Sequence, residues 1–111
     1  MICTISSMAK LRECHLEKAA VELANDAGWE NLKMDKAARS WPDQIFFGPG
    51  KTHFIVEFKR PGETPRPQQV NRHETLGALG HHVYVVDTLE QFRIIFARYV
   101  TLASQRVSSA G

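Results

Sequence analysis

The sequence predicts a single α/β domain in which a mixed β-sheet is flanked by helices. Apolar residues recur with helical spacing in some segments and alternate with polar residues, as in strands, in others. Two neighbouring strands are joined by a tight turn, and a helix then crosses over to the last strand. With 111 residues, 43% of them hydrophobic, the chain has enough material for one core and too little for a second.

The first half of the chain predicts a helix, a short strand and a β-hairpin. Ser7 is a suitable N-cap for the helix, and Gly28 suits the left-handed residue that follows its last turn. The sequence Gly48-Pro49-Gly50-Lys51 predicts the turn of the hairpin. The expected elements are a helix over residues 8–27 and strands over residues 32–34, 44–47 and 53–59.

The second half predicts a helix, a strand and a final helix. Pro67 suits the first turn of a helix that ends near Leu79, with Gly80 after it. An apolar strand follows over residues 81–86, and the capping box formed by Thr88 and Gln91 opens the last helix. The order is therefore αβββαβα in one domain over residues 1–111, with its core at about 8–100. Residues 1–7 and 104–111 are expected to be flexible.

Composition excludes several classes of protein. Two cysteines without a CxxC pair make a disulfide framework or a structural zinc site improbable, and they fit a reducing, intracellular setting. No signal peptide and no membrane-spanning apolar run are visible. The net charge is only +2, but the segment 51–73 holds five basic and two acidic residues, which suits a polyanionic partner.

The sharpest chemical feature is Pro42-Asp43 followed, after thirteen residues, by Glu57-Phe58-Lys59. Alternation along a strand places Glu57 and Lys59 on one face, and the hairpin brings Asp43 onto the neighbouring strand. Two carboxylates and a lysine at one place suit divalent-metal chemistry on a phosphodiester. The alternative is a solvated ion pair on an open strand face, with Asp43 as a turn residue.

Helical residues supply further candidates. Glu13 and Glu17 lie four apart on one face of the first helix, and Glu17 borders its apolar stripe, so that a carboxylate there would reach the sheet. Gln69 lies one turn into the second helix and His73 one turn later on the same face. Each is also consistent with an ordinary surface position. Trp41 is consistent with a core position or with stacking on DNA.

Taken in order, these stretches resemble the VRR-NUC branch of the PD-(D/E)xK nuclease superfamily, in particular its small stand-alone forms of phages and prophages. The resemblance covers about residues 10–95. The matching stretches are Arg12-Glu13, Glu17-Lys18, Gly28, Trp41-Pro42-Asp43, Val56-Glu57-Phe58-Lys59-Arg60-Pro61-Gly62, Arg66-Pro67-Gln68-Gln69 and His73-Glu74. The sequence departs from the family pattern at Ser40 and Trp41, where a glycine and a β-branched residue are common, and at Arg66.

The resemblance implies a restriction-endonuclease-like fold and a role for each matching residue. Asp43 and Glu57 match metal-binding carboxylates, the main-chain carbonyl of Phe58 matches a further metal ligand, and Lys59 matches the catalytic lysine. Gln69 matches the glutamine that opens the helix after the ExK strand. For the carboxylate of the first helix, the family register favours Glu13 as the metal ligand, and Glu17 remains the alternative.

The resemblance also implies an activity. It is the hydrolysis of DNA phosphodiester bonds by a water that Mg²⁺ or Mn²⁺ activates, in a homodimer that selects branched DNA such as Holliday junctions. The setting would be the cytoplasm of a bacterium or a phage-infected host cell. The phosphates would contact Lys51, Arg60, Arg66 and Arg72 without specifying sequence. The alternatives are a nuclease-fold module that binds DNA and cuts little on its own, and a structural protein with surface ion pairs.

Overall fold

The computed structural model describes residues 8–35, 37 and 39–110, with the side chains of residues 15–35, 37 and 39–108. It contains a four-stranded sheet in the order β1-β2-β3-β4, in which β1, β2 and β3 are antiparallel and β4 is parallel to β3. The fold is therefore the mixed sheet that the sequence predicts. The elements are α1 (Met8–Asp26), β1 (Glu30–Lys33), β2 (Gln44–Gly48), β3 (Thr52–Phe58), α2 (Pro67–Ala78), β4 (Val83–Val86) and α3 (Leu89–Ala110).

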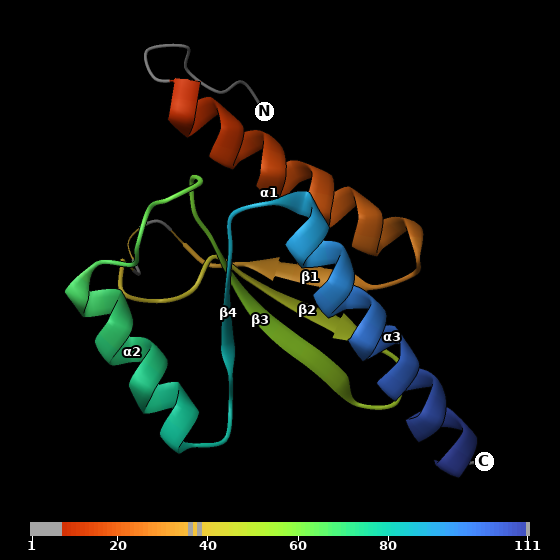
Figure 1. Cartoon of the computed structure of the whole chain (residues 1–111). Coiled ribbons are helices and arrows are strands. Elements are labelled where there is room, and N and C mark those ends of the chain that lie inside the picture. Colours follow the sequence, from red (N-terminus) through yellow and green to blue (C-terminus); the bar gives the residue numbers. More distant parts are fainter. Residues whose placement is uncertain (1–7, 36, 38, 111) are drawn as a thin grey trace.

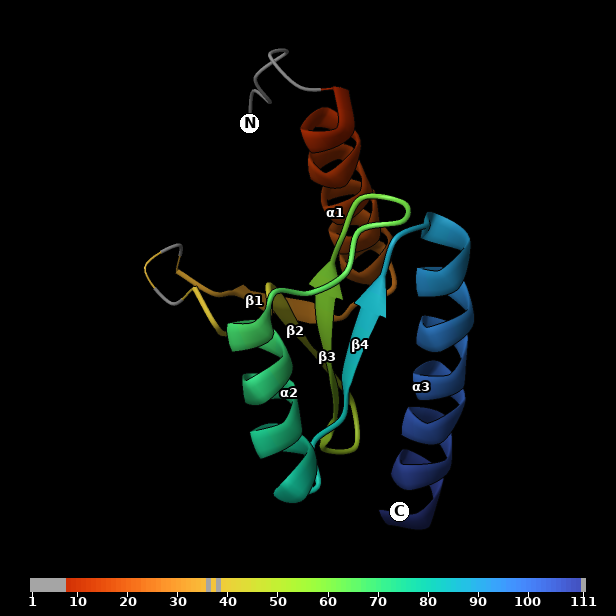
Figure 2. The same ribbon diagram turned by 60° about the vertical axis from the view of Figure 1, so that its left-hand side comes forward.

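Helices cover the two faces of the sheet unequally. Figures 1 and 2 show α1 and α3 on one face and α2 alone on the other. The main core lies under α1 and α3, where Phe46 of β2 stacks on Phe54 of β3 at 5.1 Å between ring centroids, and Phe92 of α3 closes over both. Because side chains alternate along a strand, the other face of β3 is turned toward α2.

The end of α1 follows its sequence signals. Gly28 has a φ of 87°, and the amide of Trp29 donates to the carbonyl of Ala24 at 2.9 Å. This arrangement satisfies a carbonyl at the end of the helix and turns the chain into β1. Trp29 is then buried against β2, where a Cβ on Gly48 would lie 2.3 Å from the indole ring. Gly48 is therefore required for the close approach of Trp29 to the sheet.

Helix α3 is longer than the sequence predicts. It runs to Ala110 and includes most of the segment from Ser104 that we expected to fray. Contacts with the β2–β3 turn explain the difference, because Arg106 donates to the carbonyl of Lys51 at 3.3 Å. A Cβ on Gly50 would lie 2.8 Å from the Cβ of Arg106, so the turn and the helix are in close contact. The other boundaries agree within two residues, with β4 beginning at Val83 rather than at residue 81.

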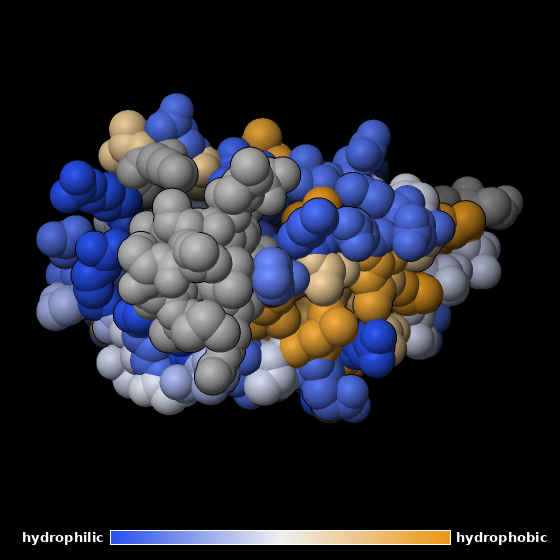
Figure 3. All heavy atoms as spheres, turned by 90° about the horizontal axis from the view of Figure 1, so that it is seen from above, coloured by the Kyte–Doolittle hydropathy of each residue, from blue (hydrophilic) through white to orange (hydrophobic). Residues whose placement is uncertain are grey.

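The surface is mixed in character. Seen from above, apolar side chains gather in one area, with hydrophilic side chains above and below it in the view (Figure 3). Among the described residues, no helix is long and apolar enough to cross a bilayer. The large apolar side chains that are more than a third exposed are Leu32, Trp41, Phe47, Val70, Leu79, Val85, Ile94, Val100 and Val107.

Candidate active site

The carboxyl end of β3 places Glu57 and Lys59 on the face of the sheet that is turned toward α2. Both are buried, with 1% of Glu57 and 6% of Lys59 exposed. The pairing of β3 with β4 continues past the strand, since the amide of Lys59 donates to the carbonyl of Val86 at 2.9 Å. The position of the lysine is therefore set by the backbone of the sheet as well as by its side-chain contacts.

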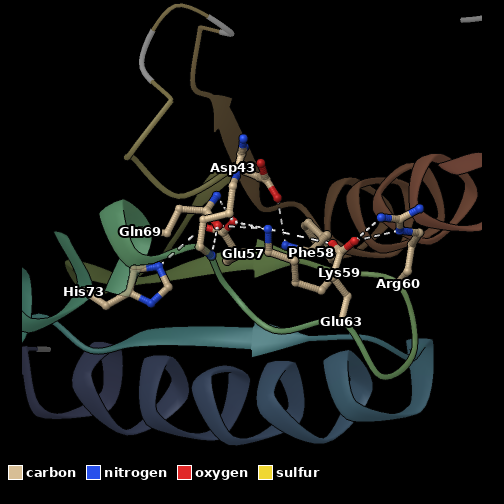
Figure 4. Close-up of polar contacts among 9 residues, drawn as sticks. Asp43, Glu57, Phe58, Lys59, Arg60, Glu63, Gln69 and His73 are labelled. Carbon is tan, nitrogen blue, oxygen red and sulfur yellow. Dashed lines mark hydrogen bonds and ion pairs between the residues drawn. The ribbon is translucent and has the colours of Figure 1, made fainter. Parts of the chain in front are cut away.

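Asp43 lies beside this end of β3. It directly precedes Gln44, which pairs with Val56 in the antiparallel register, so Asp43 is opposite Glu57. Its Oδ2 accepts a hydrogen bond from the amide of Phe58 at 2.7 Å. Figure 4 shows the carboxylates of Asp43 and Glu57 reaching the same end of the hairpin from neighbouring strands. The prediction that the hairpin would bring the two together is confirmed.

Gln69, in the first turn of α2, joins Glu57 and Lys59 through both ends of its amide. Its Nε2 donates to Oε2 of Glu57 at 2.5 Å, and its Oε1 accepts from Nζ of Lys59 at 2.9 Å. The same Oε1 also accepts from the amide of Arg66 at 3.0 Å, which holds the start of the helix. We refer to Glu57, Lys59 and Gln69 as the Glu57 cluster.

His73 completes the surroundings of Glu57. It lies one helical turn after Gln69, and its Nε2 is 3.4 Å from Oε1 of Glu57 (Figure 4). Both carboxylate oxygens of Glu57 thus face nitrogen atoms, since Nζ of Lys59 lies 3.2 Å from Oε2. A buried carboxylate without such partners would strongly destabilise the fold, so the burial of each charge, on Glu57 and on Lys59, depends on the other.

Glu63 is a member of this region that the sequence did not single out. Its Oε1 lies 3.9 Å from Nζ of Lys59, and its Oε2 accepts from Nε of Arg60 at 2.8 Å. The segment between β3 and α2 is rich in proline and has no periodicity, so no sequence signal relates Glu63 to the lysine. Glu63 therefore pairs with the side chains of both Lys59 and Arg60.

The carboxylates of α1 are placed differently. Glu17 accepts from Nζ of Lys33 at 2.9 Å and from Nε2 of Gln44 at 2.6 Å, which occupies it with β1 and the first residue of β2. One of its two partners, Gln44, directly follows Asp43 in the chain. Glu13 belongs to α1 one turn earlier, and its side chain lies outside the part of the chain that the structure describes.

Three of the four predicted phosphate-binding residues lie around the cluster. Arg60 follows Lys59, Arg66 precedes α2, and the guanidinium of Arg72 lies 4.2 Å from the centre of the Trp41 ring. Lys51 lies in the β2–β3 turn with a φ of 60°, at the opposite end of β3. The structure therefore gathers the arginines and keeps Lys51 apart from them.

The oxygen donors at this site are of the chemical types that bind a hard divalent cation. Asp43 and Glu57 offer carboxylate oxygens and Phe58 a main-chain carbonyl, which are the ligand types that Mg²⁺ prefers while it keeps several waters. Among the residues described, no group of three or more histidine, cysteine, aspartate or glutamate side chains forms a metal site. Any complete coordination shell would therefore need water, the Phe58 carbonyl or a further ligand.

The sheet topology and this site together define a class. A mixed sheet with an aspartate before one hairpin strand and a Glu-x-Lys at the end of the next is a restriction-endonuclease-like fold of the PD-(D/E)xK type. Comparison with known proteins agrees. The solved structure of a "VRR_NUC domain" superposes with a TM-score of 0.71 at 27% identity, over 79% of this chain and 97% of that one.

The family follows from a sequence relative. Over 89 residues the chain is 35% identical to "Putative nuclease p44" of Acyrthosiphon pisum secondary endosymbiont phage 1, covering 79% of this chain and 96% of the relative. A second solved structure, a "VRR_NUC domain protein", shares the fold with a TM-score of 0.65 at 17% identity, over 81% of this chain and 88% of that one. No family model matches the sequence. The chain belongs to the VRR-NUC domain family.

Proposed function

We propose that this protein is a Mg²⁺- or Mn²⁺-dependent DNA endonuclease that hydrolyses phosphodiester bonds and selects branched DNA such as Holliday junctions. The observation that carries the proposal is the buried Glu57 cluster beside Asp43 at the ends of two neighbouring strands. A protein that used these residues only for stability would gain little from burying a carboxylate and an ammonium group. Their burial is better explained by a chemical task.

The residues divide that task between binding and charge stabilisation. Asp43, Glu57 and the carbonyl of Phe58 would hold the metal, with Glu13 of α1 as the further ligand that the family register favours. A bound Mg²⁺ or Mn²⁺ would supply an acidified water and neutralise charge on the phosphoryl oxygens. Nζ of Lys59 is directed by Gln69 and would donate to the attacking oxygen or to the developing negative charge.

The basic residues account for binding to the DNA backbone. Arg60 follows Lys59, Arg66 precedes α2 and Arg72 precedes His73 in the chain, and each would neutralise a phosphate near the scissile bond. Lys51 lies about 20 Å away along β3, because each strand residue advances the chain by about 3.3 Å. A contact of Lys51 with the same DNA would therefore need a substrate that follows the length of the hairpin.

A homodimer is part of the proposal, because two sites can cut two strands of a junction. Exposed apolar side chains of α3, Ile94, Val100 and Val107, are available to a second copy. The pI of about 8.7 and the phage relative are consistent with action on DNA in the cytoplasm of a bacterium or an infected host.

The test is cleavage of labelled duplex, flap and four-way-junction DNA with and without Mg²⁺ or Mn²⁺. The wild type is compared with Lys59→Ala and with Lys18→Ala, a control at an exposed lysine of α1. We expect metal-dependent cutting, fastest on the junction, that Lys59→Ala abolishes and Lys18→Ala leaves unchanged. Binding without cutting in the wild type would instead support a nuclease-fold module that only binds DNA.

A further inference from the structure

The face of the sheet under α2 contains a cavity of about 260 Å³ that the catalytic proposal does not use. It lies over β2 and β3 and extends to α2, which is the single helix on this face of the sheet (Figure 2). Its walls are mainly apolar, with two histidines, His53 and His81, among them. They include Trp41, Pro42, Ile45, Phe47, Ile55 and Leu76.

The cavity and the candidate active site are continuous along three elements. Pro42 directly precedes Asp43, and Ile55 precedes Glu57 by two residues on the same face of β3. Leu76 follows His73 by one turn on the same side of α2. Two strand residues span about 6.6 Å, and a DNA strand advances about 3.4 Å per nucleotide, so a phosphate at the cluster has a neighbouring base within reach of the cavity.

The chemistry of the walls matches a flat aromatic ligand beside a negative charge. Trp41 and Phe47 are 39% and 44% exposed, so their rings are available to a bound molecule. Arg72 lies over the Trp41 ring, with its guanidinium 4.2 Å from the ring centre, and it also donates to Oγ of Ser40. A cation held on an exposed indole offers a phosphate contact at the rim of an apolar cavity.

We propose that this cavity, the Trp41 pocket, receives one unpaired nucleobase of a DNA strand whose phosphate lies at the Glu57 cluster. The placement of that phosphate rests on the proposed function. The volume is below the about 300–1,000 Å³ of pockets for drug-sized ligands and suits a single planar ring system. A base in a duplex must first be unpaired and unstacked, whereas the same step requires less free energy for a base at a branch point. The pocket thereby favours branched DNA without reading sequence.

The experiment measures binding in metal-free buffer, so that it does not depend on cleavage. The probes are a short single-stranded oligonucleotide and an all-abasic oligonucleotide with the same number of phosphates. Wild type should bind the first about 5- to 150-fold more tightly than the second, the range expected for stacking of a base on an aromatic side chain. Trp41→Ala should remove most of that difference, and Trp41→Phe should retain most of it.

Two further variants separate the pocket from general effects. Leu79→Ala changes an apolar residue that is 71% exposed and lies outside the pocket, and it should leave the preference unchanged. Ile45→Trp fills the pocket while leaving Trp41 and Arg72 in place, and it should lower the preference as Trp41→Ala does. Thermal melting of each variant checks that it is folded.

The outcomes are distinct. An equal preference for bases in wild type and Trp41→Ala, or no binding of either oligonucleotide, would overturn the inference. So would a sedimentation experiment in which Trp41→Ala only converts a dimer to a monomer, because the pocket would then hold a second copy. Cleavage without base-dependent binding would refute this inference alone, and base-dependent binding by a chain that cuts no DNA would refute the proposed function alone.

Discussion

Replacing Lys59 by methionine should destabilise the protein through Glu57. Methionine keeps the apolar length of the lysine side chain but removes the ammonium group that lies 3.2 Å from Oε2 of Glu57 and donates to Gln69 at 2.9 Å. Only 1% of Glu57 is exposed, so solvent compensates little for the lost partner. Removing one member of a buried ion pair typically costs about 3–5 kcal/mol.

The lower end of that range is the better expectation for Lys59→Met. Gln69 still donates to Glu57 at 2.5 Å, and His73 still faces its other oxygen. We therefore expect the free energy of unfolding to fall by about 3 kcal/mol at neutral pH. Urea unfolding followed by circular dichroism in metal-free buffer measures it, with Lys18→Met, at an exposed lysine, as the control.

A double-mutant cycle tests the cause. Glu57→Gln combined with Lys59→Met removes both charges, so the pair of changes should cost at least about 1 kcal/mol less than the sum of the single changes. A loss below about 1 kcal/mol for Lys59→Met, or strict additivity in the cycle, would refute the conclusion that the two buried charges depend on each other.

Three other predictions follow from separate parts of the structure. Gly48→Ala should lower the free energy of unfolding by about 1–3 kcal/mol, because its Cβ would overlap the buried Trp29 ring, and an unchanged melting temperature would contradict this packing. Burial and the 2.8 Å hydrogen bond with Tyr84 raise the pKa of Tyr99 from 10.0 to about 12. The folded state therefore holds this proton more tightly than the unfolded state. The contribution of this shift to the free energy of unfolding is complete below pH 10 and should be lost as the pH rises toward about 12. Urea unfolding across that range should show a smaller decline in Tyr99→Phe, and an identical decline would refute the assignment. Mg²⁺ at one hundred times its Kd should add about 2.7 kcal/mol to the free energy of unfolding of the wild type and so raise its melting temperature. Asp43→Asn should reduce this rise, and equal shifts in the two proteins would argue against Asp43 as a ligand.

Those parts of the protein that depend on local periodicity can be predicted from its sequence alone. The order αβββαβα, the hairpin and the helix ends at Gly28, Pro67 and Thr88 follow from spacing, turn residues and caps that act within a few positions. The predicted cap Ser7 and the segment 1–7 lie outside the described residues. The shared face of Glu57 and Lys59 follows from the two-residue period of a strand, and the position of Asp43 beside them follows from the register of one hairpin. These features need no knowledge of how distant segments pack.

Tertiary structure decided which of the remaining candidates meet. Gln69 and His73 share a helical face in sequence, but only the docking of α2 against the sheet brings that face to Glu57. The sequence also predicted that Glu17 borders the apolar stripe of α1, but packing decides that its partners are Lys33 and Gln44. Helix α3 runs to Ala110, and its Arg106 and Val107 lie against the hairpin turn in a segment where local composition predicted fraying.

The Trp41 pocket is also a product of tertiary structure. Strand alternation places its residues of β2 and β3 on one face, but no spacing in the chain relates them to those of the segment before β2 and of α2. One helix is too narrow to cover a face of four strands, so an apolar part of the sheet stays open beside the site. The physical reason for the division is that caps, turns and strand alternation act between neighbours in the chain, whereas burial is shared among segments that meet only in the folded state.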